Sequence, residues 1–243
     1  MEIKPIKTRK VVPPQDEIWD ILDEVAKMIR EGNIVAITSK IVSIHEGRTI
    51  KEENEPDRDK LAKGEAQYWL ERSEVPGEHM MHTIACNSLV GSSGIDHSNT
   101  NGYWVMYPKD PFKSAESIHK YLSEKSSVKK FGVIITDSHC QPLRRGTVGF
   151  ALSYWGFNPL RDYIGTPDIF GHNLRVTKMD VADALGTAAT FVMGEGIEQT
   201  PIAIISGVEE SIEFIDGAPP IAEHMVKPEE DLFKPFYSIF KKN

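Results

Sequence analysis

The sequence contains very little cysteine. Only Cys86 and Cys140 occur among its 243 residues, which is too few for a disulfide framework, and they lack the Cys-x-x-Cys spacing of zinc and redox sites. The chain also lacks an apolar run near the roughly 20 residues that cross a bilayer, and no apolar signal region follows Met1. These absences predict a cytoplasmic protein that does not act in a membrane.

An excess of positive charge is missing as well. The chain has 36 acidic and 28 basic residues, with a net charge of −8. No uniform basic surface is therefore available to neutralise a nucleic-acid backbone, and we expect no nucleic-acid partner. The phosphate-binding patterns GxxxxGK[ST] and GxGxxG are both absent, so any nucleotide must bind by a less common route.

The sequence does contain enough apolar residues for a substantial core, because 40% of its 243 residues are hydrophobic. Helical spacing of apolar residues predicts helices over residues 16–32, 176–192 and 228–240. Asp180 can cap the second of these, which stops at the glycines around Glu195. The charged stretch 49–78 is interpreted as a solvated helical excursion.

Predicted strands alternate irregularly with these helices. Apolar, β-branched runs predict them at 33–44, 81–89, 102–107, 131–135, 147–155 and 201–207. The first turns into a loop or helix at its end, and the strand 131–135 ends at Thr136-Asp137-Ser138. Because no regular βαβ succession is visible, the prediction is an α+β or complex mixed fold, formed by residues 1–243 as a single domain or as two interleaved lobes.

Three short acidic patterns stand where a strand or helix should meet a loop. They are Gly94 to Asn99, Ile134 to Ser138 and Met193 to Gly196. Carboxylate and hydroxyl oxygens from three separate elements are the ligands by which proteins bind a divalent cation and orient a phosphorylated substrate. An enzyme is therefore the leading hypothesis.

Each acidic residue also has a structural interpretation. Asp96 suits an Asx-turn, and Asp137 suits a cap at the end of a strand, where Ser138 adds a hydroxyl that could reach a second cation. Glu195 could be a solvated loop carboxylate, although its glycine neighbours equally allow the backbone to approach a phosphate. The combination indicates a site only if folding brings the three together.

Basic residues near these patterns are candidates for phosphate binding. Arg144 and Arg145 follow Asp137 closely, and arginine recognises phosphate or carboxylate with two hydrogen bonds. A surface salt bridge is the alternative for this pair, and simple solvation is the alternative for Lys40. Cys140 beside His139 suggests a thiol nucleophile, with a packed cysteine as the competing interpretation.

An ordered set of motifs resembles a known family. They are Ser43 to Arg48, Gly94 to Asn99, Gly132 to Ser138, Arg144 to Phe150 and Met193 to Gly196. In this order and spacing the chain resembles the coenzyme F420-0:γ-glutamyl ligases, from Pro5 to about Gly207. The resemblance implies a complex mixed fold of mainly antiparallel sheets with packed helices, in an intertwined homodimer.

The resemblance also implies an activity. It predicts a GTP-dependent ligase in which GTP activates a small carboxylate compound, such as coenzyme F420-0, as an acyl phosphate. The amino group of L-glutamate then displaces phosphate. Magnesium or manganese ions, two in number, would hold the nucleotide, which suits a reaction that depends on positioning and charge neutralisation.

By position, the resemblance assigns roles to individual residues. Asp96 and Asp137 would hold one cation, while Ser138 and Glu195 would hold the second, and the three acidic residues would be catalytic. The nucleotide would contact Asn99 and Ser39, Met193, Gly194, Gly196 and the segment to Thr200, with Lys40, Arg144 and Arg145 as basic candidates. Residues 9–12 align with a further nucleotide-contacting stretch, but their identities differ.

Departures from the family pattern leave two alternatives open. Ile44 stands where many members have lysine, and residues 139–142 replace a short glycine-containing turn. From these changes we expect that the protein retains the metal and phosphate chemistry of the family but acts on an altered substrate. The first alternative is a non-catalytic nucleotide-binding homologue acting as a sensor or scaffold, and the second is a metal-dependent phosphate-ester hydrolase.

Overall fold

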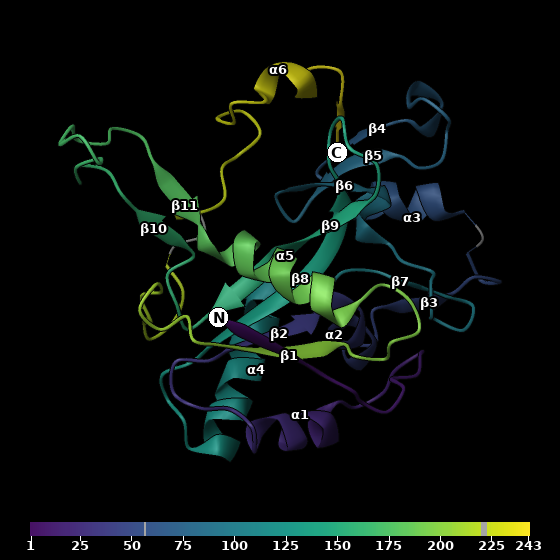
Figure 1. Ribbon diagram of the computed structural model, residues 1–243. Helices are drawn as coiled ribbons and strands as arrows, with labels where there is room; N and C mark the ends of the chain where they lie inside the picture. The colour runs from purple at the N-terminus through teal and green to yellow at the C-terminus, as the bar shows by residue number, and fades with distance from the viewer. Residues whose placement is uncertain (56, 220–222) are drawn as a thin grey trace.

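A five-stranded mixed sheet forms the centre of the computed structural model, which describes residues 1–55, 57–219 and 223–243 (Figure 1). Its strand order is β1 (Glu2–Ile6), β12 (Ile202–Ser206), β2 (Ile34–Thr38), β8 (Gly132–Cys140) and β9 (Thr147–Trp155). Only β2 and β8 pair in parallel, and every other neighbouring pair in this sheet is antiparallel. The strands β2 and β8 therefore run side by side in the same direction.

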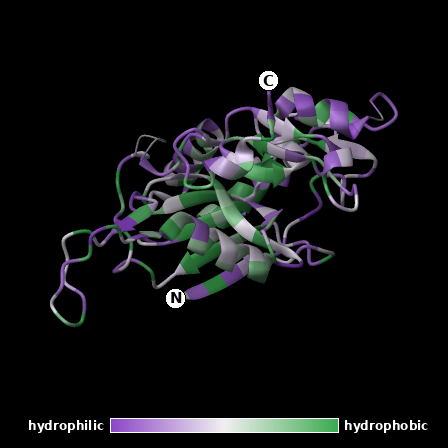
Figure 2. Cartoon of the chain, turned by 90° about the horizontal axis from the view of Figure 1, so that it is seen from above, coloured by the Kyte–Doolittle hydropathy of each residue, from purple (hydrophilic) through white to green (hydrophobic). Residues whose placement is uncertain are grey.

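The two faces of this sheet bury two separate apolar clusters. Along β2, Val35 and Ile37 belong to one cluster, and Ile34 and Ala36 belong to the other. This alternation follows from the two-residue repeat of a strand. Figure 2 shows the resulting apolar interior, with hydrophilic residues concentrated on the outer elements.

Helices cover both faces. Helices α1 (Trp19–Ala26) and α4 (Pro111–Ser126) lie together on one face, and α5 (Val181–Met193) crosses the other (Figure 1). The predicted cap of α5 is confirmed, because Asp180 accepts a hydrogen bond of 2.9 Å from the Asp183 N–H. The helix ends at Gly194, whose positive φ of 79° suits glycine.

A second layer lies beyond β8 and is built around a four-stranded antiparallel sheet. Its order is β13 (Lys241–Lys242), β4 (Tyr68–Leu70), β5 (His82–Ala85) and β6 (Ser88–Gly91), and it is accompanied by α3 (Arg58–Glu65) and the pair β3 (Thr49–Lys51) and β7 (Tyr103–Val105). Short 3-10 turns cover Arg72–Glu74 and Ser92–Gly94. The stretch 49–78, predicted as a helical excursion, thus contributes one helix and also two strands.

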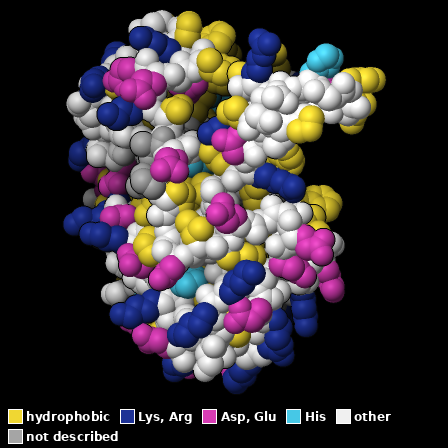
Figure 3. Space-filling model, turned by 90° about the vertical axis from the view of Figure 1, so that its left-hand side faces the viewer, with side chains coloured by type: hydrophobic (Ala, Val, Ile, Leu, Met, Phe, Trp, Pro, Cys, Tyr) yellow, Lys and Arg dark blue, Asp and Glu magenta, His cyan; other side chains and the backbone are white. Residues whose placement is uncertain are grey.

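A two-stranded arm, β10 (Leu160–Asp162) and β11 (Lys178–Asp180), carries a long loop away from the body (Figure 1). Figure 3, seen from this side, shows acidic and basic side chains interspersed, with no extended basic patch on the visible face. None of the helices in the described ranges is long and apolar enough to cross a membrane.

The predicted C-terminal helix over 228–240 is wrong in extent. Only Lys234–Tyr237 form a helix, α6, and Pro235 stands inside it. Proline removes a backbone donor, and Phe233 and Phe236 remain exposed, so no buried apolar face stabilises a longer helix. The predicted fold class, α+β with mainly antiparallel sheets and packed helices, is confirmed.

Candidate active site

A cavity of about 830 Å³ opens where β2 ends, beside the last residue of β8 that pairs with it. Five segments line it: residues 8–13 before α1, residues from 38–44 around the start of α2 (Ser39–His45), loop residues from 96–101, residues 136–138 of β8, and residues from 190–201 at the end of α5. All three predicted acidic patterns contribute to this one cavity. A single chain therefore brings them together.

The parallel pairing explains why β8 presents its polar residues here. The β2–β8 ladder ends at the pair Thr38–Thr136, where β2 gives way to α2. We predicted that β8 would also end at residues 136–138, and this is wrong. The strand continues to Cys140 because β9 still pairs with it as far as Thr147, after an irregularity at Ile135. Asp137 and Ser138 thus lie on a rigid strand just past the end of β2.

Asp96 forms the Asx-turn that its sequence suggests, and it also lines the cavity, where it is a candidate cation ligand. Its Oδ1 accepts hydrogen bonds of 2.8 Å from the Ser98 N–H and 2.9 Å from the Ser98 hydroxyl, which is the geometry of an Asx-turn. Its Oδ2 lies 2.6 Å from Lys40 Nζ. The turn therefore fixes Oδ1 of Asp96, and Oδ2 faces the positively charged side chain of Lys40 on α2.

Charge around Asp96 favours its ionised form. Burial alone would raise the pKa of this carboxyl group, but the nearby Lys40 ammonium and the hydrogen bonds from Ser98 outweigh burial and lower the pKa. Lys40 Nζ also donates to the Ser98 carbonyl at 3.0 Å. This contact ties the start of α2 to the acidic loop.

Asp137 has the opposite electrostatic behaviour. Burial raises its pKa to about 7, even though the Tyr107 hydroxyl donates to Oδ2 at 2.5 Å and favours the charged form. The negative charge of Asp96 adds to the rise. The charge of Asp96 thus disfavours the ionised form of Asp137, and a cation between the two would favour that form.

The segment after α5 forms the opposite wall. Gly194 and Gly196 line the cavity, and the Asn99 side chain donates to the Gly196 carbonyl at 3.0 Å, which ties this wall to the loop of Asp96. Glu195 is exposed and lines the cavity as well. The predicted nucleotide residues Asn99, Met193, Gly194 and Gly196 are therefore brought together.

Other predicted contacts lie elsewhere. Ser39 is buried and is not among the residues that line the cavity. Arg144 and Arg145 occupy the exposed turn between β8 and β9, also outside the lining. The predicted role of these arginines in phosphate binding finds no support within one chain, and it stays a prediction.

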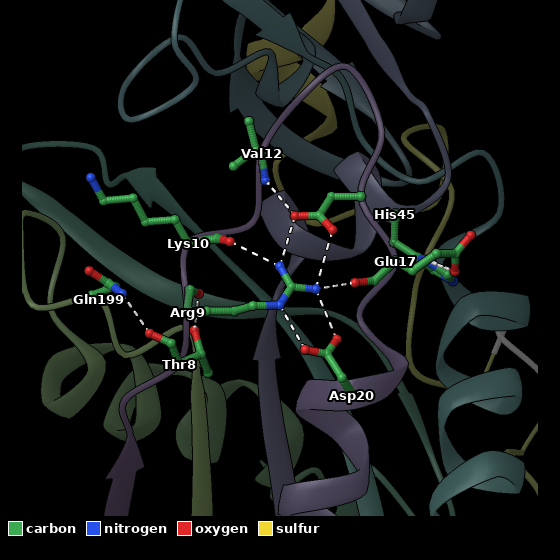
Figure 4. A network of polar contacts seen from close by, with 9 residues as sticks. Thr8, Arg9, Lys10, Val12, Glu17, Asp20, His45 and Gln199 are labelled. Atoms are coloured by element: carbon green, nitrogen blue, oxygen red, sulfur yellow. Dashed lines mark hydrogen bonds and ion pairs between the residues drawn. The ribbon is translucent and has the colours of Figure 1, made fainter.

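The N-terminal wall of the cavity is held by Arg9 (Figure 4). Its guanidinium donates to Asp16 Oδ2 at 2.8 Å and to Asp20 Oδ1 at 2.8 Å, and it also contacts the carbonyls of Lys10 and Glu17. With every nitrogen engaged inside the protein, Arg9 acts as a structural clamp. The Lys10 side chain points away from this network (Figure 4).

Residues 5–207 match the family described as F420-0:Gamma-glutamyl ligase. The match covers most of the 243 residues, and its limits agree with the resemblance predicted from Pro5 to about Gly207. The chain belongs to this family. The predicted enzyme class, a ligase that joins an acid to an amino acid, is thereby confirmed.

Individual relatives resemble the chain over nearly its whole length. The coenzyme F420:L-glutamate ligase of Methanopyrus kandleri is 30% identical over 248 residues, which span 96% of this chain and 98% of that protein. The protein of the same name from Methanocaldococcus jannaschii is 33% identical over 226 residues, spanning 85% and 86% of the two chains. That of Methanococcus maripaludis strain C6 is 35% identical over 233 residues, spanning 90% and 92%.

Two side chains that line this cavity are of the type that divalent cations prefer as ligands. Asp96 and Asp137 supply hard carboxylate oxygens, and Ser138 adds a hydroxyl at the same wall. Across residues 1–55, 57–219 and 223–243, no group of three or more His, Cys, Asp or Glu side chains is gathered as around a metal ion. Glu195 therefore shares the cavity with the aspartate pair without forming a ready-made cluster with it.

Sequence reasoning missed one residue beside this site. Tyr107, which follows β7, donates a hydrogen bond to Asp137. Glu198 lies in the predicted segment 193–200, lines the cavity and accepts a hydrogen bond of 2.8 Å from the Gly196 N–H. No local signal marks Tyr107, because its partner lies 30 positions away in sequence.

Proposed function

We propose that this protein is a GTP-dependent ligase that adds L-glutamate to coenzyme F420-0, or to a related small carboxylate compound, through an acyl phosphate. The observation that carries the proposal is the convergence of Asp96, Asp137 and Lys40 with the glycine-containing segment 193–196 in one cavity of a family member. The cavity volume lies within the range of small-molecule sites, which is roughly 300–1,000 Å³.

The acidic residues account for cation binding in this proposal. Asp96 and Asp137 would hold one magnesium or manganese ion, and Ser138 with Glu195 would hold a second. When bound, such ions neutralise phosphate charge and fix the phosphates for in-line attack. The aspartates are preorganised for this task, since an Asx-turn orients Asp96 and a continuous strand carries Asp137.

The neighbouring groups account for nucleotide binding. Lys40 can exchange its contact with Asp96 for a phosphate oxygen without leaving the cavity. The Glu198 carboxylate lies against Gly194 and Gly196 and accepts a hydrogen bond of 2.8 Å from the Gly196 N–H, so a phosphate or ribose that approaches this backbone would displace it. Asn99 braces this segment from the opposite wall.

The proposed reaction has two steps. An oxygen of the acceptor carboxylate attacks the γ-phosphorus of GTP, the bond to the GDP oxygen breaks, and an acyl phosphate forms. The amino nitrogen of L-glutamate then attacks the acyl carbon, inorganic phosphate leaves, and the nitrogen loses a proton. Positioning by the cavity and neutralisation of phosphate charge supply the rate acceleration.

The test combines the purified protein with GTP, manganese, L-glutamate and F420-0, and it follows the product by mass spectrometry and phosphate release in parallel. The expected product is the acceptor with one or more glutamates added, with one phosphate released for each amide formed. Phosphate release that is independent of glutamate would point instead to a phosphate-ester hydrolase. No product with F420-0 and a panel of related acids would refute the ligase.

One observation favours a non-catalytic nucleotide sensor as a second candidate. Ile44 lines the cavity where many members of the family carry lysine, and it is almost completely buried. One charged contact to the nucleotide is thus absent. Metal-dependent GTP binding measured by calorimetry, without phosphate release or transfer in the same preparation, would select the sensor.

A homodimer is part of the same proposal. Ile169 and Phe170 on the projecting arm, and Phe191 on α5, are large apolar side chains with more than three quarters of their surface exposed. Surfaces of this kind commonly pack against a second subunit. Light scattering after size exclusion should give about twice the chain mass of 27.3 kDa.

A further inference from the structure

Tyr107 connects both aspartates of the proposed cation site. Asp96 and Val105 form an isolated antiparallel bridge with two backbone hydrogen bonds of 2.9 Å. Tyr107 follows Val105 by two residues and therefore emerges beside the acidic loop. From there its hydroxyl donates to Asp137 Oδ2 at 2.5 Å, across to β8.

The ring of Tyr107 occupies space that Gly94 leaves open. A Cβ atom at Gly94 would stand only 2.0 Å from Cζ of this ring, so no other residue type could occupy the position without moving the tyrosine. The side chain is 4% exposed, and the backbone carbonyl of Tyr107 accepts a hydrogen bond of 3.0 Å from Arg48 Nε. Packing and hydrogen bonding thus fix the phenol in one place.

The phenol acts as a donor toward Asp137. A phenol hydroxyl keeps its proton at neutral pH, and this one lies 2.5 Å from Asp137 Oδ2. A donor held at Oδ2 restricts rotation of the carboxylate, so a cation would meet Oδ1, the oxygen that does not accept from Tyr107. Hydrogen bonds of this kind to metal-binding carboxylates commonly set ligand orientation.

We infer that Tyr107 is a positioning residue that orients Asp137 for monodentate binding of the divalent cation in this cavity. The inference rests on the proposed cation site and deepens it. It assigns a role to a side chain that contacts neither nucleotide nor acceptor in the proposed function. Gly94 takes part by leaving the space in which the ring lies.

The experiment measures Mn²⁺ binding to the whole protein without nucleotide, by counting free Mn²⁺ with electron paramagnetic resonance. Tyr107→Phe removes only the hydroxyl and should lower Mn²⁺ affinity about 10-fold. With the same variant, the apparent KM for Mn²⁺ in turnover should rise while kcat recovers at saturating metal. Tyr121→Phe is the matched control, since it removes a similar tyrosine–aspartate hydrogen bond of 2.7 Å, to Asp23, away from the cavity.

The outcomes separate this inference from the proposed function. Mn²⁺ binding that is unchanged in Tyr107→Phe, while wild type binds and Asp137→Asn does not, overturns the role of Tyr107 alone. Equal losses of affinity in Tyr107→Phe and Tyr121→Phe would indicate a general effect on the fold and would overturn it too. A wild-type protein that binds no Mn²⁺ overturns the cation site and the positioning role together.

Discussion

Lys40 Nζ lies 2.6 Å from Asp96 Oδ2, so the acidic side of the cavity carries a positive charge of its own. The contact joins α2 to a loop 56 residues further along the chain. Both side chains are partly buried, and their attraction is therefore stronger than that of a pair in bulk water. A cation that binds Asp96 must compete with Lys40 for the carboxylate. A phosphate that enters the cavity can instead bind the Lys40 ammonium.

Replacing Lys40 should therefore affect metal and nucleotide in opposite directions. Lys40→Met removes the competing charge and should strengthen Mn²⁺ binding in the absence of nucleotide by about 3- to 10-fold, equivalent to roughly 1 kcal/mol. The same variant should weaken GTP binding, because a phosphate partner is lost. Calorimetric titrations with each ligand check both signs, and Lys40→Arg, which keeps the charge, should change each affinity less. Weaker Mn²⁺ binding in Lys40→Met would contradict the competition.

Asp137 should be required for turnover but not for folding. Asp137→Asn keeps the shape of the side chain and its contact with Tyr107, and it removes the negative charge that a cation needs. Turnover should fall by about 100-fold or more, since altering even an outer partner of a metal ligand commonly costs 10–100-fold. Steady-state kinetics measure the loss, and circular dichroism should give an unchanged spectrum. Activity close to that of wild type would remove Asp137 from the site.

Arg9 should act on nucleotide binding through the N-terminal wall. Arg9→Met breaks the hydrogen bonds to Asp16 and Asp20 and frees residues 8–13, so the KM for GTP should rise while kcat stays within about twofold. Lys125→Met breaks a comparable surface ion pair with Asp23, remote from the cavity, and should leave KM unchanged. Equal KM changes in the two variants would argue against the clamp.

The stability effect of Arg9 should depend on pH. The hydrogen bond from Arg9 is the main cause that lowers the pKa of Asp20 below its ordinary value of 3.8. A carboxyl group with a lowered pKa in the folded state stabilises the fold above the ordinary value, and this contribution is lost as the pH falls through the lowered value. The Tm difference between wild type and Arg9→Met should thus be a few degrees at pH 7 and should shrink below about pH 3.8. Thermal scans across this range measure it.

Local signals in the sequence predicted much of the fold. The strand predicted at residues 147–155 has the same bounds as β9. The cap at Asp180 and the stop at Gly194 follow from short-range chemistry that any helix end requires. These features depend on a few neighbouring residues and are visible without the tertiary structure.

Features that depend on distant partners could not be predicted in the same way. The end of β8 is set by its pairing with β9 and not by its own composition, so its extension to Cys140 was missed. The contact between Tyr107 and Asp137 requires the bridge at Asp96 to fix the register, and nothing near Tyr107 reveals that bridge. Asp96, Asp137 and Glu195 were identified from their motifs, but their convergence depends on the tertiary structure, in which parallel pairing places the end of β2 beside Asp137.

The two cysteines should differ in reactivity, and neither should be needed for catalysis. Cys86 is partly buried, and burial raises the pKa of its thiol to about 11, so almost no thiolate exists at pH 8. Cys140 is exposed at the end of β8. A thiol reagent should therefore modify Cys140 quickly and Cys86 only on unfolding, as mass spectrometry of digested protein can show. Cys140→Ser should retain turnover within about twofold, because neither proposed step uses a thiol. Complete loss of activity in Cys140→Ser, with unchanged GTP binding, would bring covalent catalysis by this residue back into consideration.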